Sequence, residues 1–276
     1  MIDLHSHILP GVDDGTADSA AALELARAFV DDGVLVVACT PHILPGLYHN
    51  RGPEILIAVS NLQAALNERD IPLVLVSGAD NHITPDFIDG LSSGRLLALH
   101  ASRYVLVEPP HHSAPPLMEE FFANVLANGY VPILTHPERL SWIREKYALV
   151  ERLVQQGVWM QITAGSLTGA YGTTAQYWAE RMLDEGLVHI LASDAHDTSH
   201  RPPNLTAGRE AAARRVGFEE AENLVFLRPR GILENVAPSE LPQPIGLRVN
   251  DARPKLVDGV SLRSSRLAGG LRRLFA

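Results

Sequence analysis

Two histidines near the start of the chain have a spacing that suits a metal ion. Ile2 and Leu4 alternate with polar neighbours as in a short strand, and the run breaks at Pro10-Gly11. The side-chain period of a strand is two, so His5 and His7 point to the same side. At an open strand end, two such imidazoles can bind one ion. They could equally end a strand without any ligand role, so the test is whether further ligands follow downstream.

Residues with ligand chemistry also follow most of the other predicted strands. They are His42, Asp80, Glu108, His136, Asp194 and His196. Asp14, in the loop after the first strand, is either another ligand or a turn residue. Histidines and carboxylates without cysteine suit Mn²⁺, Fe or Zn²⁺. This many ligands implies two or three ions, and clustered ions activate water and align the oxygens of a phosphoryl group.

The elements that must position these residues are short apolar strands, each followed by a helical segment. After the first strand, strands are predicted at 34–40, 72–77, 104–108, 131–136, 158–162 and 188–192, and helices at 18–30, 53–69, 116–128, 143–156 and 174–185, with a short one near Pro85. Continuous apolar strands are buried on both faces, which indicates parallel strands covered by helices. Seven such units predict an α/β fold that closes, or nearly closes, into a barrel, with an open doubly wound sheet as the alternative. The carboxyl ends of barrel strands meet on one face, so the ligand-type residues should converge there.

Composition narrows the class of protein. The net charge is −9, and residues 246–276 hold seven Lys and Arg against two Asp, which leaves −14 on residues 1–245. Such an acidic body argues against nucleic-acid binding. Cys39 is the single cysteine and lies in an apolar strand, so we expect a core residue and no internal disulfide. We see neither a signal peptide nor a membrane span and expect a cytoplasmic protein.

Several motifs, taken together, resemble one protein family. They are His5-Ser6-His7, Leu9 to Gly15, Thr40-Pro41-His42, Thr135 to Arg139, Gln161 to Gly169, and Ala192 to Asp197 followed by Arg201-Pro202-Pro203. The ordered set resembles the polymerase and histidinol phosphatase (PHP) superfamily. Within it, the set is similar to the manganese-dependent bacterial protein-tyrosine phosphatases of capsule and exopolysaccharide operons. The similarity runs from Met1 to about Val236.

The resemblance implies a fold and a set of roles. The fold would be a distorted (β/α)7 barrel with a trinuclear Mn²⁺ centre. By the same resemblance, His5, His7 and Asp194 hold the first ion and Asp80 bridges it to the second; Glu108 and His136 complete the second, and Asp14, His42 and His196 hold the third. Arg139 matches the arginine that contacts phosphate, and a guanidinium pairs bidentately with phosphate oxygens. His42 or His196 would donate a proton to the leaving group if free of its ion.

Some residues depart from that pattern or lie beyond it. The family usually has glutamate at the position of Asp80, and aspartate is one methylene shorter, so a bridge there requires altered spacing or leaves one ion weakly bound. His82, His111 and His112 lie near ligand strands and could reach the rim of the site, or they could be solvated loop residues. Arg201 could line the cleft or lie on the surface.

The implied substrate is a phosphotyrosine protein, in particular a bacterial tyrosine kinase that controls capsular or exopolysaccharide synthesis. The alternatives are a phosphatase of histidinol phosphate, a nucleotide or a sugar phosphate, or a metal-binding regulator of the kinase without turnover. We predict a catalytic domain over 1–240 and a Pro-containing, basic tail over 241–276. The tail is either disordered or a weak contact to an anionic membrane surface or an acidic partner.

Overall fold

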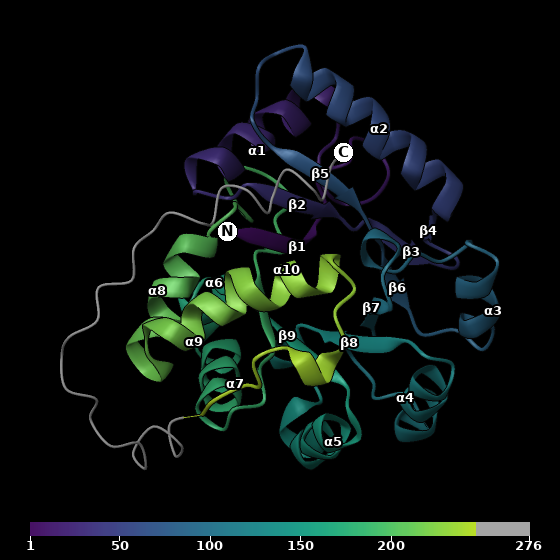
Figure 1. The fold of residues 1–276 in the computed structure, drawn as a ribbon. Coiled ribbons are helices and arrows are strands. Elements are labelled where there is room, and N and C mark those ends of the chain that lie inside the picture. Colours follow the sequence, from purple (N-terminus) through teal and green to yellow (C-terminus); the bar gives the residue numbers. More distant parts are fainter. Residues whose placement is uncertain (247–276) are drawn as a thin grey trace.

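The computed structural model describes residues 1–246 of the chain (Figure 1). Its strands form two hydrogen-bonded sheets, with the orders β1-β2-β5 and β10-β9-β8-β7-β6-β3-β4. The strands are β1 (Ile2–Ser6), β2 (Val36–Cys39), β3 (His42–Leu44), β4 (Tyr48–His49), β5 (Val74–Ser77), β6 (Asp80–His82), β7 (Tyr104–Glu108), β8 (Val131–Thr135), β9 (Trp159–Thr163) and β10 (Ile190–Ala192). Except for β4, which pairs antiparallel with β3, neighbouring strands are parallel.

The two sheets together make one ring of seven parallel strands. Two residues separate β2 from β3, and two separate β5 from β6, so each pair is one long strand interrupted near Pro41 and Gly78. The ring closes between β1 and the segment after β10, where His7 N donates to Ala195 O at 2.9 Å and Asp194 N donates to His5 O at 3.0 Å. These bonds rule out the open doubly wound sheet. The predicted barrel is confirmed, and the interrupted strands account for its distortion.

Helices surround the strands, as Figure 1 shows. Those between strands are α1 (Ser19–Asp31), α2 (Gly52–Asn67), α3 (Phe87–Ser92), η1 (Leu99–Ala101), α4 (Met118–Ala127), η2 (Pro137–Arg139), α5 (Ile143–Gln156), α6 (Ala164–Leu167) and α7 (Gly172–Asp184). Asp18 caps α1 by accepting from Ala21 N at 2.9 Å, which satisfies an amide that the first turn leaves free. The apolar faces of the helices pack on alternate strand residues such as Val37, Val105 and Met160. The predicted helices therefore form, with ends that differ from the prediction by at most two residues.

The opposite strand faces form a second apolar cluster inside the ring. Leu4, Leu106, Ile133 and Ile190 belong to it, and Ile232 closes it from α10 (Arg228–Leu233). Alternation of side chains between the two faces is what separates the two clusters. The interior is thus a packed core, and the site must lie at its end.

The chain after β10 forms helices whose bounds were not predicted from the sequence. They are α8 (Leu205–Val216), α9 (Phe218–Glu222), η3 (Asn223–Leu227), α10 (Arg228–Leu233) and η4 (Pro238–Glu240). Residues 241–246 continue against the barrel: Leu241 packs on the inner cluster, and Pro242 O accepts from Arg228 Nε at 2.6 Å. The boundary at residue 240 stays a prediction, and the basic part of the tail lies outside the described residues.

None of the helices within residues 1–246 combines the length and the apolar character that crossing a membrane requires.

Candidate metal centre

The structure brings together, at the carboxyl ends of the strands, all nine side chains that the sequence predicts as ligands. His5 and His7 come from the end of β1, Asp14 from the following loop, His42 from β3, Asp80 from β6, Glu108 from the end of β7, His136 from just after β8, and Asp194 and His196 from just after β10. Parallel strands that close into a ring deliver their ends to one face, so the convergence follows from the fold. The role of these residues as ligands stays a prediction.

The first part of the cluster contains His5, which is on β1, and His7, which directly follows β1. His5 Nε2 lies 3.2 Å from His7 Nε2 and 3.5 Å from Oδ2 of Asp80. Oδ1 of Asp194 lies 3.5 Å from His5 Nε2 and 3.3 Å from His7 Nε2. Two imidazole nitrogens and two carboxylate oxygens therefore surround one point, which is the kind of donor set that Zn²⁺, Mn²⁺ or Fe takes.

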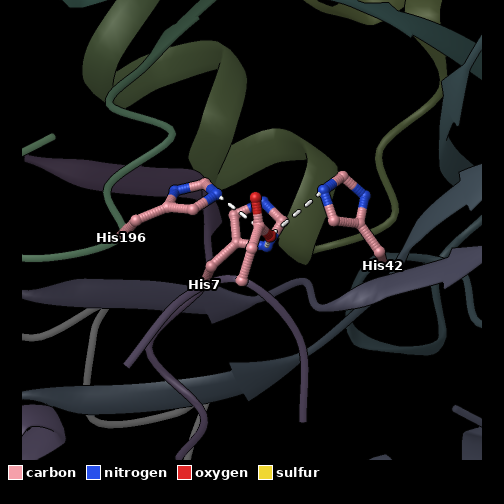
Figure 2. Close-up of side chains that lie close together, drawn as sticks. His7, His42 and His196 are labelled. Atoms are coloured by element: carbon pink, nitrogen blue, oxygen red, sulfur yellow. Dashed lines mark ion pairs between the residues drawn. The ribbon is translucent and has the colours of Figure 1, made fainter. Parts of the chain in front are cut away.

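A second part lies where His7, His42 and His196 converge (Figure 2). Asp14 Oδ1 lies 3.5 Å from His42 Nε2 and 3.4 Å from His196 Nε2, the two ion pairs drawn dashed in the figure. The Asp14 side chain is 44 % exposed, so this part is open to solvent. The turn that carries Asp14 is held close to the histidines by Gly15, where a Cβ would come within 2.0 Å of His7 O.

The third part centres on Glu108. Its Oε2 lies 3.2 Å from His42 Nδ1, and its Oε1 lies 3.5 Å from His136 Nε2. His82 Nε2 contacts Oε2, and His111 Nε2 lies 3.5 Å from Oε1. Of the three extra histidines considered from the sequence, His82 and His111 thus reach the cluster. His112 is exposed and belongs to none of the possible metal-binding groups among the described residues.

Three residues that the sequence analysis did not single out hold the cluster in place. Asp13 Oδ2 lies 2.7 Å from His7 Nδ1, and Gln161 Oε1 lies 2.8 Å from His5 Nδ1. Glu138 Oε1 accepts from Thr163 N at 2.9 Å and from Ser166 Oγ at 2.7 Å, which ties the segment after β8 to β9. A partner on the second ring nitrogen fixes the tautomer and turns the other nitrogen toward a metal. The sequence could have pointed to Gln161, because it is a polar residue within an apolar strand. Nothing in the sequence indicates that Asp13 pairs with His7.

Burial dominates the electrostatics of the cluster. Burial, together with the charge of Glu108, raises the pKa of Asp80 well above its usual range. Burial lowers the pKa of His5 to about 4. Burial also opposes the charge of His7, but the carboxylates of Asp13 and Asp194 outweigh it and raise the pKa of His7 to about 10. Closely packed groups with pKa values pushed in opposite directions are typical of functional sites.

The residues fit a bound metal because several buried donor atoms in the cluster lie near one another without forming hydrogen bonds among the described residues. Within residues 1–246, no hydrogen bond reaches either carboxylate oxygen of Asp80, Oε2 of Glu108, Nδ1 of His42 or Nε2 of His82. Leaving a buried polar atom unpaired costs about 1–3 kcal/mol, more for a charged group. A divalent cation would satisfy several of these lone pairs at once, and the donors are those that Mn²⁺, Fe and Zn²⁺ accept.

Two residues of the cluster have left-handed backbone. His136, directly after β8, has φ 34°, and Asp194, two residues after β10, has φ 54°. A non-glycine residue held there is strained by about 1–3 kcal/mol, and such strain is common at functional sites. The sharp turn aims each side chain over the end of the ring.

Two arginines border the cluster. Arg139 and Arg201 both form ion pairs with Asp194 Oδ2, and Arg201 Nη1 donates to His196 Nε2 at 2.7 Å. The guanidinium of Arg139 lies 4.3 Å from the centroid of the Tyr171 ring, and Arg201 Nε donates to Tyr171 Oη at 3.3 Å. Arg201 therefore lies in the site and not on the surface. A cavity of about 470 Å³, lined by His111, Arg139, Tyr171 and Trp178 among others, opens beside them.

Two relatives that are named as tyrosine-protein phosphatases, one of them putative, align with most of this chain. The chain is 38% identical over 201 residues to the tyrosine-protein phosphatase YwqE of Bacillus subtilis, covering 73% of this chain and 79% of YwqE. It is 34% identical over 223 residues to the putative tyrosine-protein phosphatase CapC of Staphylococcus aureus, covering 81% of this chain and 88% of CapC.

A solved structure shares the fold. The match is to crystal structures of YwqE from Bacillus subtilis and CpsB from Streptococcus pneumoniae, described as unique metal-dependent tyrosine phosphatases. It has a TM-score of 0.83 at 34% identity and covers 89% of this chain and 99% of the other. The family described as "Capsular polysaccharide synthesis, CpsB/CapC" matches residues 1–234. The chain belongs to the CpsB/CapC family of capsular polysaccharide synthesis.

Proposed function

We propose that this protein is a metal-dependent protein-tyrosine phosphatase that uses two or three Mn²⁺ ions. Its substrate would be a phosphotyrosine protein, in particular a bacterial tyrosine kinase that controls capsular or exopolysaccharide synthesis, and the reaction would take place in the cytoplasm. The observation that carries the proposal is the set of buried, unpartnered donor atoms beside two arginines. The names of the relatives support the same activity.

The residues divide into holders of the ions and binders of the phosphate. His5, His7, Asp80 and Asp194 would hold one ion, Asp80, Glu108 and His136 a second, and Asp14, His42 and His196 a third. Bound ions would supply a nucleophilic hydroxide at neutral pH and offset charge on the phosphoryl oxygens. Gln161 and Asp13 keep the imidazoles of His5 and His7 in the orientation that the first ion needs.

Arg139 would bind the phosphate and orient it. Its guanidinium reaches the same Asp194 oxygen that Arg201 reaches, so both cations lie at the mouth of the cluster. A planar guanidinium can donate two parallel hydrogen bonds to phosphate oxygens, and it stabilises the charge that grows on them during transfer. Arg201 is a second donor at the same position.

The tyrosyl oxygen needs little help in leaving, because a phenol has a pKa of about 10. His42 Nε2 would hold the proton that it takes up, if free of its ion. His196 Nε2 could do so only after it separates from Arg201 Nη1, which donates to it. Both imidazole nitrogens lie beside the solvent-exposed side chain of Asp14, so either imidazole can be protonated again from the solvent on that side.

The cavity next to Arg139 favours a large aromatic substrate over a small phosphate ester. Its volume of about 470 Å³ far exceeds that of one phosphate, and its walls include Tyr171 and Trp178. Aromatic walls bind a tyrosyl ring by offset or edge-to-face packing. The neighbouring residues of a peptide could lie in the same cavity.

A substrate panel with and without metal tests the proposal. We expect the Mn²⁺-loaded protein to hydrolyse phosphotyrosine peptides at least 10-fold faster, in kcat/KM, than histidinol phosphate, nucleoside monophosphates, sugar phosphates or phosphoserine peptides. Removal of metal by EDTA should abolish turnover, and Mn²⁺ should restore it. Turnover that persists in EDTA contradicts a metal mechanism. Faster hydrolysis of a small phosphate would show the alternative substrate class, and no turnover in the loaded protein would leave a metal-binding regulator.

A further inference from the structure

His82 lies inside the cluster although the set of ligands described above has no place for it. It is two residues beyond Asp80 on β6, so both side chains point to the same face, toward the end of the ring. Asn81, between them, points the other way and donates to three backbone carbonyls, those of Ala79, Leu97 and Leu106. The strand therefore presents an aspartate and a histidine to the site in fixed positions.

The register of the sheet places His82 directly beside Glu108. The two residues are partners in the parallel pairing of β6 with β7. His82 Nε2 contacts Glu108 Oε2, and that same oxygen lies 3.2 Å from His42 Nδ1. The rings of His42 and His82 have centroids 5.5 Å apart. One donor atom from each of His42, His82 and Glu108 lies within 4.8 Å of the others, which is the spacing of ligands around one ion.

The donor atoms of this trio are also free to bind. His42 Nδ1, His82 Nε2 and Glu108 Oε2 are buried without a hydrogen-bond partner in the described part of the chain. Glu108 as a whole is 4 % exposed, so water cannot readily solvate its carboxylate. Three unpaired donors that face one point need a cation or a proton between them.

Asp80 explains why a further ligand is useful here. Its carboxylate is completely buried, and Oδ2 lies 3.5 Å from both His5 Nε2 and His42 Nδ1. The aspartate side chain is one methylene shorter than glutamate, so it extends less far from β6 toward Glu108. His82, on the same strand, reaches the Glu108 oxygen directly.

We propose that His82 is an additional metal ligand, which with Glu108 holds a divalent cation on the β6–β7 side of the centre and makes up for the short reach of Asp80. His42 shares this cation through Nδ1 only when its Nε2 does not bind the third ion, because a neutral imidazole has one free lone pair. The proposal rests on the proposed metal-dependent function, but it concerns metal binding alone. It links the roles of His82 and Asp80 in metal binding: the less a carboxylate at position 80 contributes as a ligand, the more the ion depends on His82.

The test measures metal binding without substrate. Wild type, His82→Gln and His82→Asn are stripped of metal, checked for fold by circular dichroism, and titrated with Mn²⁺ by calorimetry and by competition with a fluorescent chelator. His112→Gln is the matched control, since His112 is an exposed histidine outside the cluster. We expect both His82 variants to lose one bound ion, or to bind one ion at least 10-fold more weakly, while His112→Gln matches wild type. Unchanged stoichiometry and affinity in both His82 variants would overturn the proposal.

Two further measurements separate a ligand from a neighbour. Co²⁺ substituted for Mn²⁺ should give a visible absorption spectrum that changes in His82→Gln and not in His112→Gln, because loss of an imidazole alters the ligand field. Adding Asp80→Glu to His82→Gln should restore the lost affinity. No spectral change, or no restoration by the longer carboxylate, would contradict this link between His82 and Asp80. Because these readouts involve no phosphate ester, normal His82-dependent metal binding with no phosphotyrosine turnover would refute only the proposed function.

Discussion

The two ends of the barrel bury charged groups in different ways. At the amino-terminal end, Arg228 is completely buried, and its guanidinium donates to Pro242 O at 2.6 Å, His189 O at 3.2 Å and Glu220 Oε2 at 2.9 Å. Asn223 Nδ2 also donates to Glu220 Oε2, at 3.2 Å. His189, just before β10, accepts from Met160 N at 3.1 Å. Each of these charged or polar groups has a protein partner.

At the carboxyl-terminal end, several buried carboxylate oxygens and imidazole nitrogens lie close to one another but form no hydrogen bond among the described residues. Asp80, Glu108, His42 and His82 all have buried donor atoms without a hydrogen bond in the part of the chain that the structure describes. Both clusters are buried and polar, so burial alone does not distinguish a structural network from a binding site. What distinguishes them is whether the buried polar atoms have hydrogen bonds. A network in which every polar atom is hydrogen-bonded stabilises the fold, whereas a network with unbonded polar atoms is suited to bind a ligand.

The largest effect should come from removing a predicted ligand at the unsatisfied end. We expect His136→Ala to lower kcat/KM for a phosphotyrosine peptide at least ~1,000-fold, about 4 kcal/mol of transition-state stabilisation. Its thermal midpoint without metal should stay within about 3 °C of wild type, since the imidazole has few partners to lose. Steady-state kinetics and calorimetry check both, with His112→Ala as the control. Activity retained in His136→Ala would show that this end is not the metal centre.

At the amino-terminal end, where the buried polar groups are hydrogen-bonded, we expect a substitution to lower stability and leave activity unchanged. Glu220→Gln leaves Arg228 buried without its counter-charge, and breaking a buried ion pair costs about 3 kcal/mol or more. Urea unfolding should show that loss, while kcat/KM at 25 °C stays within about 2-fold. Glu219→Gln, an exposed neighbour on α9, should change neither value. If Glu220→Gln proved as stable as wild type, the contrast between the two ends would fail.

The metal-binding end of the barrel is easier to predict from the sequence than the hydrogen-bonded network at the amino-terminal end. Apolar runs that end in His, Asp or Glu are local signals, so the strand ends and eight of the nine candidate ligands could be predicted. Asp14 lies in a loop, and only the family resemblance made it a candidate ligand rather than a turn residue. The approach of His82 to Glu108 depends on the register of β6 against β7, which is not encoded in either segment alone. The same holds for Arg228 with Glu220, whose helices follow the last predicted strand, and for the interruption of two strands near Pro41 and Gly78. Closure of the ring is likewise a long-range property.

His189, at the amino-terminal end of the barrel, should also make folding stability depend on pH. Burial, and then the charge of Arg228, lowers the pKa of His189 to about 3 from its usual 6.5. The folded protein therefore binds fewer protons than the unfolded chain between these values, so stability is full above pH 6.5 and falls as the pH drops toward 3. At pH 5 the loss from this residue is about 2 kcal/mol.

The variant His189→Asn tests that dependence, because its amide oxygen can still accept from Met160 N. Between pH 7 and pH 5, the metal-free variant should lose about 2 kcal/mol less unfolding free energy than metal-free wild type. His200→Asn is the control, since the His200 side chain is 90 % exposed. Identical pH profiles for His189→Asn and wild type would mean that His189 is not the residue that is protonated on unfolding.

The smallest expected effect is a change in stability on substituting Asp80, and it compares the two ends of the barrel most directly. Asp80→Asn removes a buried carboxylate with no hydrogen-bond partner in the described chain, next to the like charge of Glu108. A neutral side chain of the same shape avoids that desolvation and repulsion, so we expect the metal-free protein to gain about 1 kcal/mol. Saturating Mn²⁺ should reverse the order, because wild type gains more from binding. Thermal unfolding with and without Mn²⁺ measures both, with Glu24→Gln, exposed on α1, as the control. A loss of stability in metal-free Asp80→Asn would show that the carboxylate has a structural partner, as Glu220 does at the other end.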